Sequence, residues 1–495
     1  MTNWIADNRA SLSFFAPEIA MMLFSVLTLL IGASVKGSRK AASAVGALAA
    51  ITYVVLSARL LTQTTPKTLF SEAISVDPFA IFFKIFFGVV TFVTVLFVAR
   101  SKEYAGKSLA EVVAFLLALT VGMSMMAAST DLIMMFLSLE TVSILSYILV
   151  GLKKHSRMSA EAGLKYVLYG AVASGTMLFG FSYLFGLVGS TNLMDIAAYF
   201  HNLSGISSAP IVLFILLSVM MGFGFKIATF PTQMWCPDVY EGAPLPVTAF
   251  LSVGPKAAGF ALAIRFFYTA FGLAGGQGTE MFGFVHWGLL VAILSALTMT
   301  IGNLAAIPQR NLKRLMAYSS IAHAGYLLMG FSALTHEGVQ AVLFYLVTYL
   351  LMNLGAFLII SAVADRIGTE EIDGYRGLGW RSPVLAAILS VFLFSLTGLP
   401  PFAGFVGKFF LFSAVIQQRL YWLAVVGVIN SAISLYYYAR IVKAMYLDSP
   451  LDPTPVRLST AYGSLAWVLA ISTLVLGIYW EPVVAFAGRS AGALF

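Results

Sequence analysis

The chain has very little cysteine and little charge for its length. Its 495 residues include one cysteine, Cys236, and five histidines, and only 10% of the residues are charged. A single cysteine cannot form an internal disulfide, and the histidines are too scattered to suggest a set of metal ligands. We therefore expect no metal, no redox group and no other cofactor in this chain.

Hydrophobic residues, in contrast, make up 60% of the chain. Soluble globular domains are about 45–50% apolar, so this composition predicts an integral membrane protein. The formal net charge of +8 would suggest nucleic-acid binding in a soluble protein. Here the basic residues fall in short loops between apolar runs, where they orient the chain in the membrane, and we expect no nucleic-acid site.

Fourteen apolar runs are long enough to cross a bilayer, which takes about 20 helical residues. They predict an all-α polytopic membrane protein with about fourteen transmembrane helices. The seventh run is interrupted at Pro231 and the twelfth at Pro400 and Pro401, so we expect both helices to be discontinuous. The approximate limits are 14–34, 41–61, 78–99, 109–128, 131–151, 162–188, 210–229, 246–271, 284–305, 312–334, 337–364, 383–416, 419–447 and 459–484.

Basic residues are distributed unevenly between the two sides of the membrane. Loops after odd-numbered runs carry eighteen of the 29 Lys and Arg residues, whereas the N-terminus and the loops after even-numbered runs carry five. Cytoplasmic loops are rich in Lys and Arg, so both termini are expected in the periplasm of a bacterial inner membrane. The eighteen are Lys36, Arg39, Lys40, Arg100, Lys102, Lys107, Lys153, Lys154, Arg157, Arg310, Lys313, Arg314, Arg366, Arg376, Arg381, Arg440, Lys443 and Arg457.

Two landmarks recur at nearly equal offsets. The sequence YILVG at 147–151 resembles YLLMG at 326–330, 179 residues later, and Lys226 beside the first interruption corresponds to Lys408 beside the second, 182 residues later. A repeated unit of five helices enters the membrane from opposite sides, which makes an inverted repeat. We therefore expect three helices in 1–108, two five-helix repeats in 109–271 and 284–447, and a last helix in 459–495.

Charged residues inside the apolar runs predict an ion path. An ammonium at membrane depth costs from about 3 to more than 10 kcal/mol, so it persists where a partner or a water-filled interior receives it. Lys84 and Arg265 are close enough to the ends of their runs to anchor at an interface. The six cations within the runs that belong to no loop are Lys84, Lys165, Lys226, Lys256, Arg265 and Lys408, and the carboxylate considered with them is Glu140.

Lys226, just before the Pro231 break, is the strongest candidate, because a nearby carboxylate would control its protonation. Glu140 either donates a hydrogen bond when protonated or pairs with a buried cation and titrates. Lys165 has two interpretations: a surface pair with Glu161 one turn earlier, or a partner of Glu140 on the adjacent helix.

Lys256, after Pro255, and Lys408, after the second break, are expected to carry protons, with hydrogen bonding to freed carbonyls as the alternative. His323 is either a packed core residue or a relay together with Tyr326. Asp238 and Glu241, in the connection near the inner surface, are either solvated or bound to the ends of half-helices. Secondary candidates for lining a wet path are Tyr147, Tyr166, Tyr169, Tyr326, Tyr345 and Tyr349.

The charged positions and two motifs resemble the antiporter-like subunits of respiratory complex I. The motifs are QMWCPDVYEGAPLPVTAF at 233–250 and MAYSSIAHAGYLL at 316–328. Within these subunits the chain is most similar to the family of subunit N of bacterial NADH:quinone oxidoreductase, which is equivalent to subunit 2 of the mitochondrial-type enzyme. The resemblance covers essentially the whole chain, whereas subunits L and M look more like PFHxWLPDA at the first motif.

The resemblance implies a subunit of a proton-translocating translocase with one proton channel. It implies that a Glu140–Lys165 pair modulates Lys226, that Lys256 is the central relay, and that Lys408 connects to the periplasm. It also implies that NADH, flavin, iron–sulfur clusters and quinone bind to other subunits, with no direct NADH binding here. The implied partners are membrane-arm subunits of the M and K types, and lipids.

Two other functions remain open. A subunit of a sodium/proton antiporter would exchange cations without a redox partner. A non-pumping structural spacer of the membrane arm would lose assembly, rather than pumping alone, when its lysines are changed. The QMWCPDVYEGAP segment favours the redox-driven pump, by resemblance.

Overall fold

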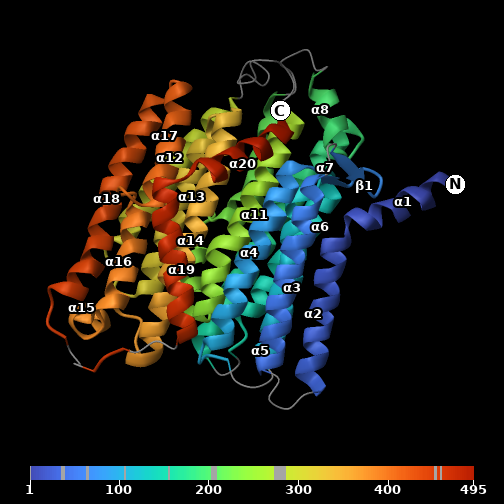
Figure 1. The fold of residues 1–495 in the computed structure, drawn as a ribbon. Helices are drawn as coiled ribbons and strands as arrows, with labels where there is room; N and C mark the ends of the chain where they lie inside the picture. Colours follow the sequence, from blue (N-terminus) through green and yellow to red (C-terminus); the bar gives the residue numbers. More distant parts are fainter. Residues whose placement is uncertain are drawn as a thin grey trace.

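The computed structural model describes residues 2–34, 39–62, 66–104, 108–153, 156–201, 209–271, 286–450, 454–456 and 460–495. Figure 1 shows long helices standing side by side in one bundle, with both ends of the chain toward its upper end. Among the basic loop residues, Lys36, Lys107, Lys154 and Arg457 lie outside the described residues.

The helices are α1 (Thr2–Phe14), α2 (Ala16–Ser34), α3 (Arg39–Arg59), α4 (Pro78–Arg100), α5 (Ser108–Ala128), α6 (Leu132–Val150), α7 (Arg157–Val188), α8 (Leu193–His201), α9 (Ala209–Ile227), α10 (Trp235–Gly242), α11 (Leu245–Phe271), α12 (Trp287–Ala306), α13 (Leu312–Ser332), α14 (His336–Ile367), α15 (Leu378–Arg381), α16 (Pro383–Thr397), α17 (Ala403–Gln417), α18 (Tyr421–Tyr446), α19 (Thr460–Ile478) and α20 (Glu481–Ala491). Short 3-10 helices are η1 (Leu60–Thr62), η3 (Ile372–Tyr375) and η4 (Gly492–Leu494). One antiparallel hairpin of β1 (Lys67–Leu69) and β2 (Ile74–Val76) departs from the all-α expectation.

The expected polytopic helical architecture is confirmed. In the described ranges eleven helices are long and apolar enough to cross a membrane, or twelve if the sharply bent pair of α19 and α20 counts as one span. Each of the fourteen apolar runs coincides with a helix or a pair of helices. The number fourteen itself stays a prediction, because α13 and the short helices α16 and α17 are not among the eleven.

Both predicted interruptions are present. α9 ends at Ile227, and the chain passes through Pro231 in turns before α10 begins. α16 ends just before Gly398, whose φ of +90° is a conformation that residues with a Cβ rarely adopt, and α17 begins only after Pro400 and Pro401. Neither segment can continue as one regular helix through its prolines.

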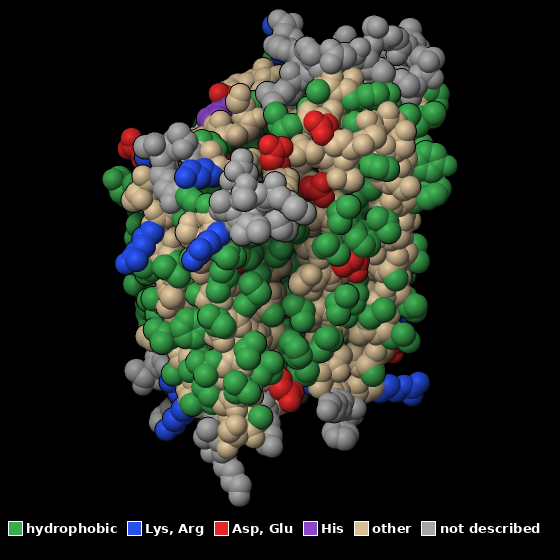
Figure 2. Space-filling view, turned by 90° about the vertical axis from the view of Figure 1, so that its right-hand side faces the viewer, with side chains coloured by type: hydrophobic (Ala, Val, Ile, Leu, Met, Phe, Trp, Pro, Cys, Tyr) green, Lys and Arg blue, Asp and Glu red, His purple; other side chains and the backbone are tan. Residues whose placement is uncertain are grey.

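The centre of the bundle is α11, in which every residue except Thr269 is buried. It packs against α4, α5, α9 and α14, so the charged residues on α11 are shielded on all sides by other helices. The outer helices show the opposite pattern: Leu23, Val26 and Leu30 of α2 are each more than half exposed. Figure 2 shows hydrophobic side chains spread across the middle of the flank on this side of the bundle, as expected for a surface that contacts lipid.

The assignment of Lys84 to an interface is wrong. Its Nζ lies 2.9 Å from Glu18 Oε1, and only 1% of either side chain is exposed. Ser124 Oγ donates to the same carboxylate oxygen at 2.5 Å. Lys84 is near the start of its helix in the sequence, but Glu18 comes from α2 and Ser124 from α5, so the lysine pairs inside the bundle.

The same assignment is wrong for Arg265 on α11. Its guanidinium binds both oxygens of Asp77 at 2.8 and 2.9 Å, and Nε donates to the Ala127 carbonyl at 2.6 Å. Burial alone would raise the pKa of Asp77, but Arg265 lowers it below its ordinary value. Asp77 also accepts the N–H of Ala80 and caps α4. Arg265 therefore joins α11 to the start of α4.

We expect Lys84→Met to lower the free energy of unfolding by about 3 kcal/mol, because it leaves the Glu18 carboxylate buried without its cation. The double variant Glu18→Gln/Lys84→Met should regain most of that loss. Reversible unfolding in mixed detergent micelles measures both values. Lys443→Met, at an exposed lysine, is the control, and wild-type stability of the Lys84→Met variant would contradict the pairing.

Candidate functional site

Lys226 lies in the last turn of α9, directly before the first break, and is only 1% exposed. Its Nζ donates a hydrogen bond to Ser143 Oγ of α6 at 3.0 Å. Glu140, one turn before Ser143, is near enough for its charge to act on Lys226, although the two form no direct ion pair. Glu140 Oε1 is buried and has no hydrogen-bond partner among the described residues. The carboxylate therefore influences the lysine while remaining free to form another hydrogen bond.

Lys165 does not pair with Glu140, so the second of its two predicted partners is wrong. Its Nζ lies 2.8 Å from Glu161 Oε1 and 2.7 Å from Asp238 Oδ2, and 38% of its side chain is exposed. The surface pair with Glu161 is therefore the interpretation that holds. Asp238 comes from α10, 73 residues further along the chain, so helical spacing gives no sign of it.

The acidic residues of α10 are bound by the other half of the chain. Arg314, in the first turn of α13, places Nη1 at 2.7 Å from both Asp238 Oδ1 and Glu241 Oε2. Neither acid binds a half-helix end through these contacts. Instead, the two acids hold the short helix α10 between Lys165 of α7 and Arg314 of α13.

Lys256 lies inside α11 and is 3% exposed. Its Nζ donates to Ser320 Oγ of α13 at 2.6 Å and lies 3.9 Å from Cys236 Sγ. The same ammonium is 5.6 Å from the centre of the Tyr240 ring. Cys236 and Tyr240 both belong to α10, so this helix covers the central lysine.

α10 and α11 also contact the end of α9. Trp235 Nε1 donates to the Phe225 carbonyl at 3.0 Å, in the helical turn that carries Lys226. On α11, a Cβ added at Gly259 would lie 2.7 Å from Ile227 Cγ2 and 3.2 Å from the Cβ and Cγ of Lys226, so a larger residue would force the end of α9 to shift. A shift of α10 would therefore change the surroundings of both Lys226 and Lys256.

His323 lies at the centre of a buried cluster of hydroxyl groups. Its Nδ1 is 2.6 Å from Tyr345 Oη, and its Nε2 is 3.4 Å from Tyr438 Oη. Tyr349 Oη donates to Ser320 Oγ at 2.9 Å, the same oxygen that accepts from Lys256. The His323 and Tyr349 rings are 5.1 Å apart. Polar groups thus lead from Lys256 to the histidine.

Lys408 lies on α17 and is 3% exposed. Its Nζ donates to the Thr397 carbonyl at 2.8 Å, which the second break frees from its helix, and to Ser431 Oγ at 3.0 Å. The ammonium also lies 4.4 Å from the centre of the Tyr326 ring. The Tyr326 ring is in turn 6.0 Å from the His323 ring, so Tyr326 links Lys408 to the histidine.

The structure thus places Glu140 with Lys226, and His323 and Tyr326 between Lys256 and Lys408. It leaves Lys165 and the half-exposed Tyr169 outside this interior. Sequence reasoning missed three residues in the cluster: Ser320, Ser431 and Tyr438. Ser320 is three residues before His323 on the same helix, so helical spacing could have identified it. Within the described residues no three His, Cys, Asp or Glu side chains are arranged to hold a metal.

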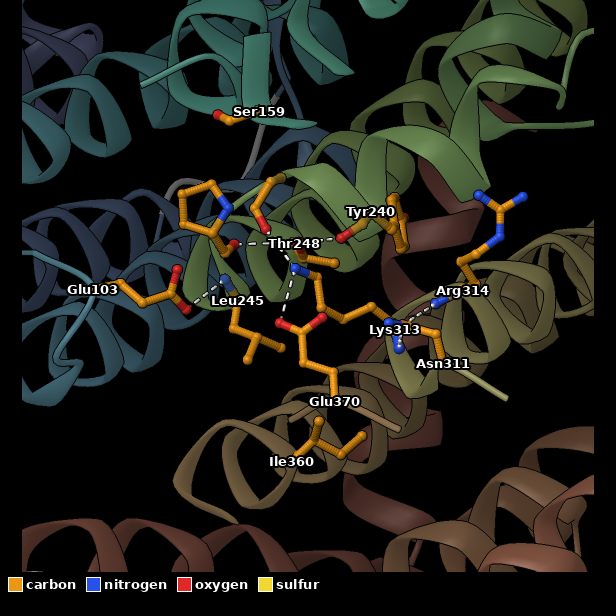
Figure 3. Close-up of polar contacts among 12 residues, drawn as sticks. Glu103, Ser159, Tyr240, Leu245, Thr248, Asn311, Lys313, Arg314, Ile360 and Glu370 are labelled. Carbon is orange, nitrogen blue, oxygen red and sulfur yellow. Dashed lines mark hydrogen bonds and ion pairs between the residues drawn. The ribbon is translucent and has the colours of Figure 1, made fainter. Parts of the chain in front are cut away.

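The junction between α10 and α11 is held by two opposite charges (Figure 3). Lys313 Nζ donates to the Ala243 carbonyl at 2.9 Å, at the end of α10. Glu103 Oε1 accepts the N–H of Leu245, the first residue of α11, at 3.0 Å. A cation at a helix C-terminus and an anion at an N-terminus both match the helix dipole.

Each of these two charges has its own counter-ion. Lys313 lies 3.1 Å from Glu370 Oε1, and Glu103 forms an ion pair with Lys153. Lys313 lies in the first turn of α13, and Glu103, Lys153 and Glu370 lie in the loops that follow α4, α6 and α14. The junction therefore ties the helix that carries Lys256 to α4, α6, α13 and α14 at the end of the bundle opposite the termini.

A family model described as NADH:quinone oxidoreductase/Mrp antiporter, TM matches residues 129–434 of the chain. A NADH-quinone oxidoreductase subunit N from Anaeromyxobacter sp. strain Fw109-5 is 44% identical, over 98% of this chain and 98% of its own. A subunit N 2 from Sorangium cellulosum strain So ce56 is 46% identical, over 99% of each chain.

Among solved structures, a chain of respiratory complex I from Thermus thermophilus with bound aureothin is 30% identical to this one. The match covers 95% of this chain and 98% of that one, with a TM-score of 0.78.

We expect Glu103→Ala to speed hydrogen exchange at the start of α11 by about tenfold, because the Leu245 N–H loses a charged acceptor. Lys313→Met should have a similar effect on the last turn of α10. Exchange mass spectrometry of peptides that span 238–250 measures both effects. Lys443→Met should leave the exchange unchanged. Wild-type rates in the Glu103 and Lys313 variants would show that these two charges do not hold the junction between α10 and α11.

Proposed function

Because the chain belongs to the family of subunit N of NADH-quinone oxidoreductase, among the NADH:quinone oxidoreductase/Mrp antiporter membrane subunits, we propose that its buried charges carry protons across the membrane. It is an antiporter-like, multi-pass subunit of the membrane arm. The proposal concerns which of its residues move the proton and how the redox reaction in other subunits drives them.

One observation carries the proposal: the interior lysines differ in the kind of partner they have. Lys84 pairs with the carboxylate of Glu18. Lys226, Lys256 and Lys408 instead donate to hydroxyl, carbonyl or thiol groups and to no carboxylate within the described residues. A buried ammonium without an adjacent counter-charge can release its proton at modest cost, whereas a paired one is held charged.

The roles follow the order of the residues in space. Lys226, under the influence of Glu140, receives a proton at the first break. Lys256 is the central relay, and Ser320, Tyr349 and His323 connect it towards Lys408. Lys408, beside the second break and the Tyr326 ring, delivers the proton to the periplasmic side.

Electrostatic coupling is sufficient to drive these steps. At an effective dielectric constant of about 20, one unit charge at about 6 Å is worth roughly 3 kcal/mol, which changes proton occupancy about 100-fold. A charge that arrives from a neighbouring subunit near Glu140 would act on Lys226 in this way. Lys165 would act through Asp238 on α10, which touches the helical turn of Lys226 and the ammonium of Lys256.

The wider setting is part of the same proposal. Residues 109–271 and 284–447 form two inverted five-helix repeats, and both termini face the periplasm from the inner (plasma) membrane. NADH, flavin, iron–sulfur clusters and quinone bind to other subunits, and this chain holds no cofactor. Its neighbours are subunits of the M and K types, together with lipids.

Two alternatives lead to different outcomes. The description of the matching family also names an antiporter. A subunit of a sodium/proton antiporter predicts sodium-dependent proton exchange in vesicles without NADH or quinone. A structural spacer predicts that lysine variants fail to assemble. Loss of pumping in a fully assembled complex, with no dependence on sodium, separates the proposed function from both.

We expect Lys226→Met and Glu140→Gln to lower the number of protons pumped per NADH oxidised by about tenfold in an assembled complex. Lys226→Arg is the sharper variant, because arginine keeps the charge but does not release its proton. Proton uptake by inverted vesicles gives the pumping rate. The rate of NADH oxidation, measured in a second sample with an uncoupler, gives the denominator of the ratio. Lys443→Met is the control. Normal pumping by Lys226→Arg would show that Lys226 has only a structural role.

A further inference from the structure

A groove between α3, α4 and α19 has no part in the proposed proton path. Its volume is about 830 Å³. Its lining comes from the first turns of α3, the last turns of α4 and the beginning of α19, which lie at the front of the bundle in Figure 1. The groove therefore opens at the end of the bundle opposite the chain termini, where the basic loops gather.

Three cations and no acidic residue line the groove. They are Arg39 and Lys40, at the start of α3, and Arg100, at the end of α4. Arg39 is fixed in place, since its Nη2 donates to the carbonyls of Ala99 and Ser101 at 3.1 and 2.7 Å. Lys40 and Arg100 are exposed, and neither forms an ion pair with an acid of the described residues. The groove thus presents three positive charges to an anion.

The rest of the lining is apolar and leads away from the cations. Phe92 and Leu96 precede Arg100 by two turns and one turn on α4, so the apolar part extends about 12 Å towards the middle of the membrane. Ala47 of α3 forms one wall, and Val468 of α19, which is 59% exposed, forms the opposite one. A ligand that fills both parts needs an anionic head joined to a hydrocarbon chain.

We propose that this groove binds one anionic glycerophospholipid from the adjoining leaflet. Its phosphate lies among Arg39, Lys40 and Arg100, and one acyl chain lies along Phe92 and Leu96. Basic pockets between transmembrane helices on the positively charged side are suited to anionic lipid headgroups. A free phosphate would leave the apolar part empty, and a zwitterionic lipid would bring a cation of its own headgroup close to the three cations of the groove. The inference does not depend on the proton path.

The test is a titration of the assembled complex, stripped of bound lipid, with dioleoylphosphatidylglycerol, followed by native mass spectrometry of the lipids retained. Removal of each cation should weaken binding about fivefold, so Lys40→Gln/Arg100→Gln should weaken it roughly 25-fold. Ala47→Trp, which fills the apolar part and keeps the cations, should also weaken binding. Arg157→Gln, at an exposed arginine at the same end of the bundle, should bind as the wild type does.

Three results would overturn the proposal. The first is equal retention by the wild type and the double variant, with the complex intact in both. The second is equally tight retention of dioleoylphosphatidylcholine, which would show that the headgroup charge is irrelevant. The third is displacement of the lipid by millimolar inorganic phosphate, which would identify a phosphate site.

Discussion

The cost of removing an ammonium from water governs this structure. Each interior lysine must find an oxygen, and an α-helix uses its own carbonyls, so oxygens become available only on side chains or where a helix ends or breaks. Lys408 takes the carbonyl of Thr397 that the second break leaves free. Lys226 and Lys256 take the hydroxyls of Ser143 and Ser320. These neutral partners hold the lysines in place without fixing their charge.

α10 connects the parts of this interior. It carries Trp235 and Cys236 towards the two lysines and presents Asp238 and Glu241 to Lys165 and Arg314 on its other face. Its junction with α11 is clamped by Lys313 and Glu103. An ionic change at the surface can therefore reach the central lysine through one eight-residue helix, without a large movement of the bundle.

Much of this arrangement could be predicted from the sequence. Prolines in apolar runs located both breaks, and charges at membrane depth identified Glu140, Lys226, Lys256 and Lys408. The partners could not be predicted, because helical spacing reports only neighbours within one helix. For Lys165 the sequence offers Glu161, which the structure confirms, and Glu140, which it does not, and it gives no sign of Asp238. It places Lys84 at an interface because a single run does not show which other helices cover it. Tyr345 and Tyr349 beside His323 are among the predicted candidates, whereas Ser431 and Tyr438 are not, because they come from α18.

The central claim is that protons pass between lysines whose partners are neutral, and water must fill the gaps that side chains leave. A density map of the complex that resolves ordered water tests this most directly. The account predicts a continuous line of waters and hydroxyl groups from Glu140 past Lys226, Lys256 and His323 to Lys408. A dry, apolar gap between Lys226 and Lys256, or between His323 and Lys408, in every state of the enzyme would contradict it.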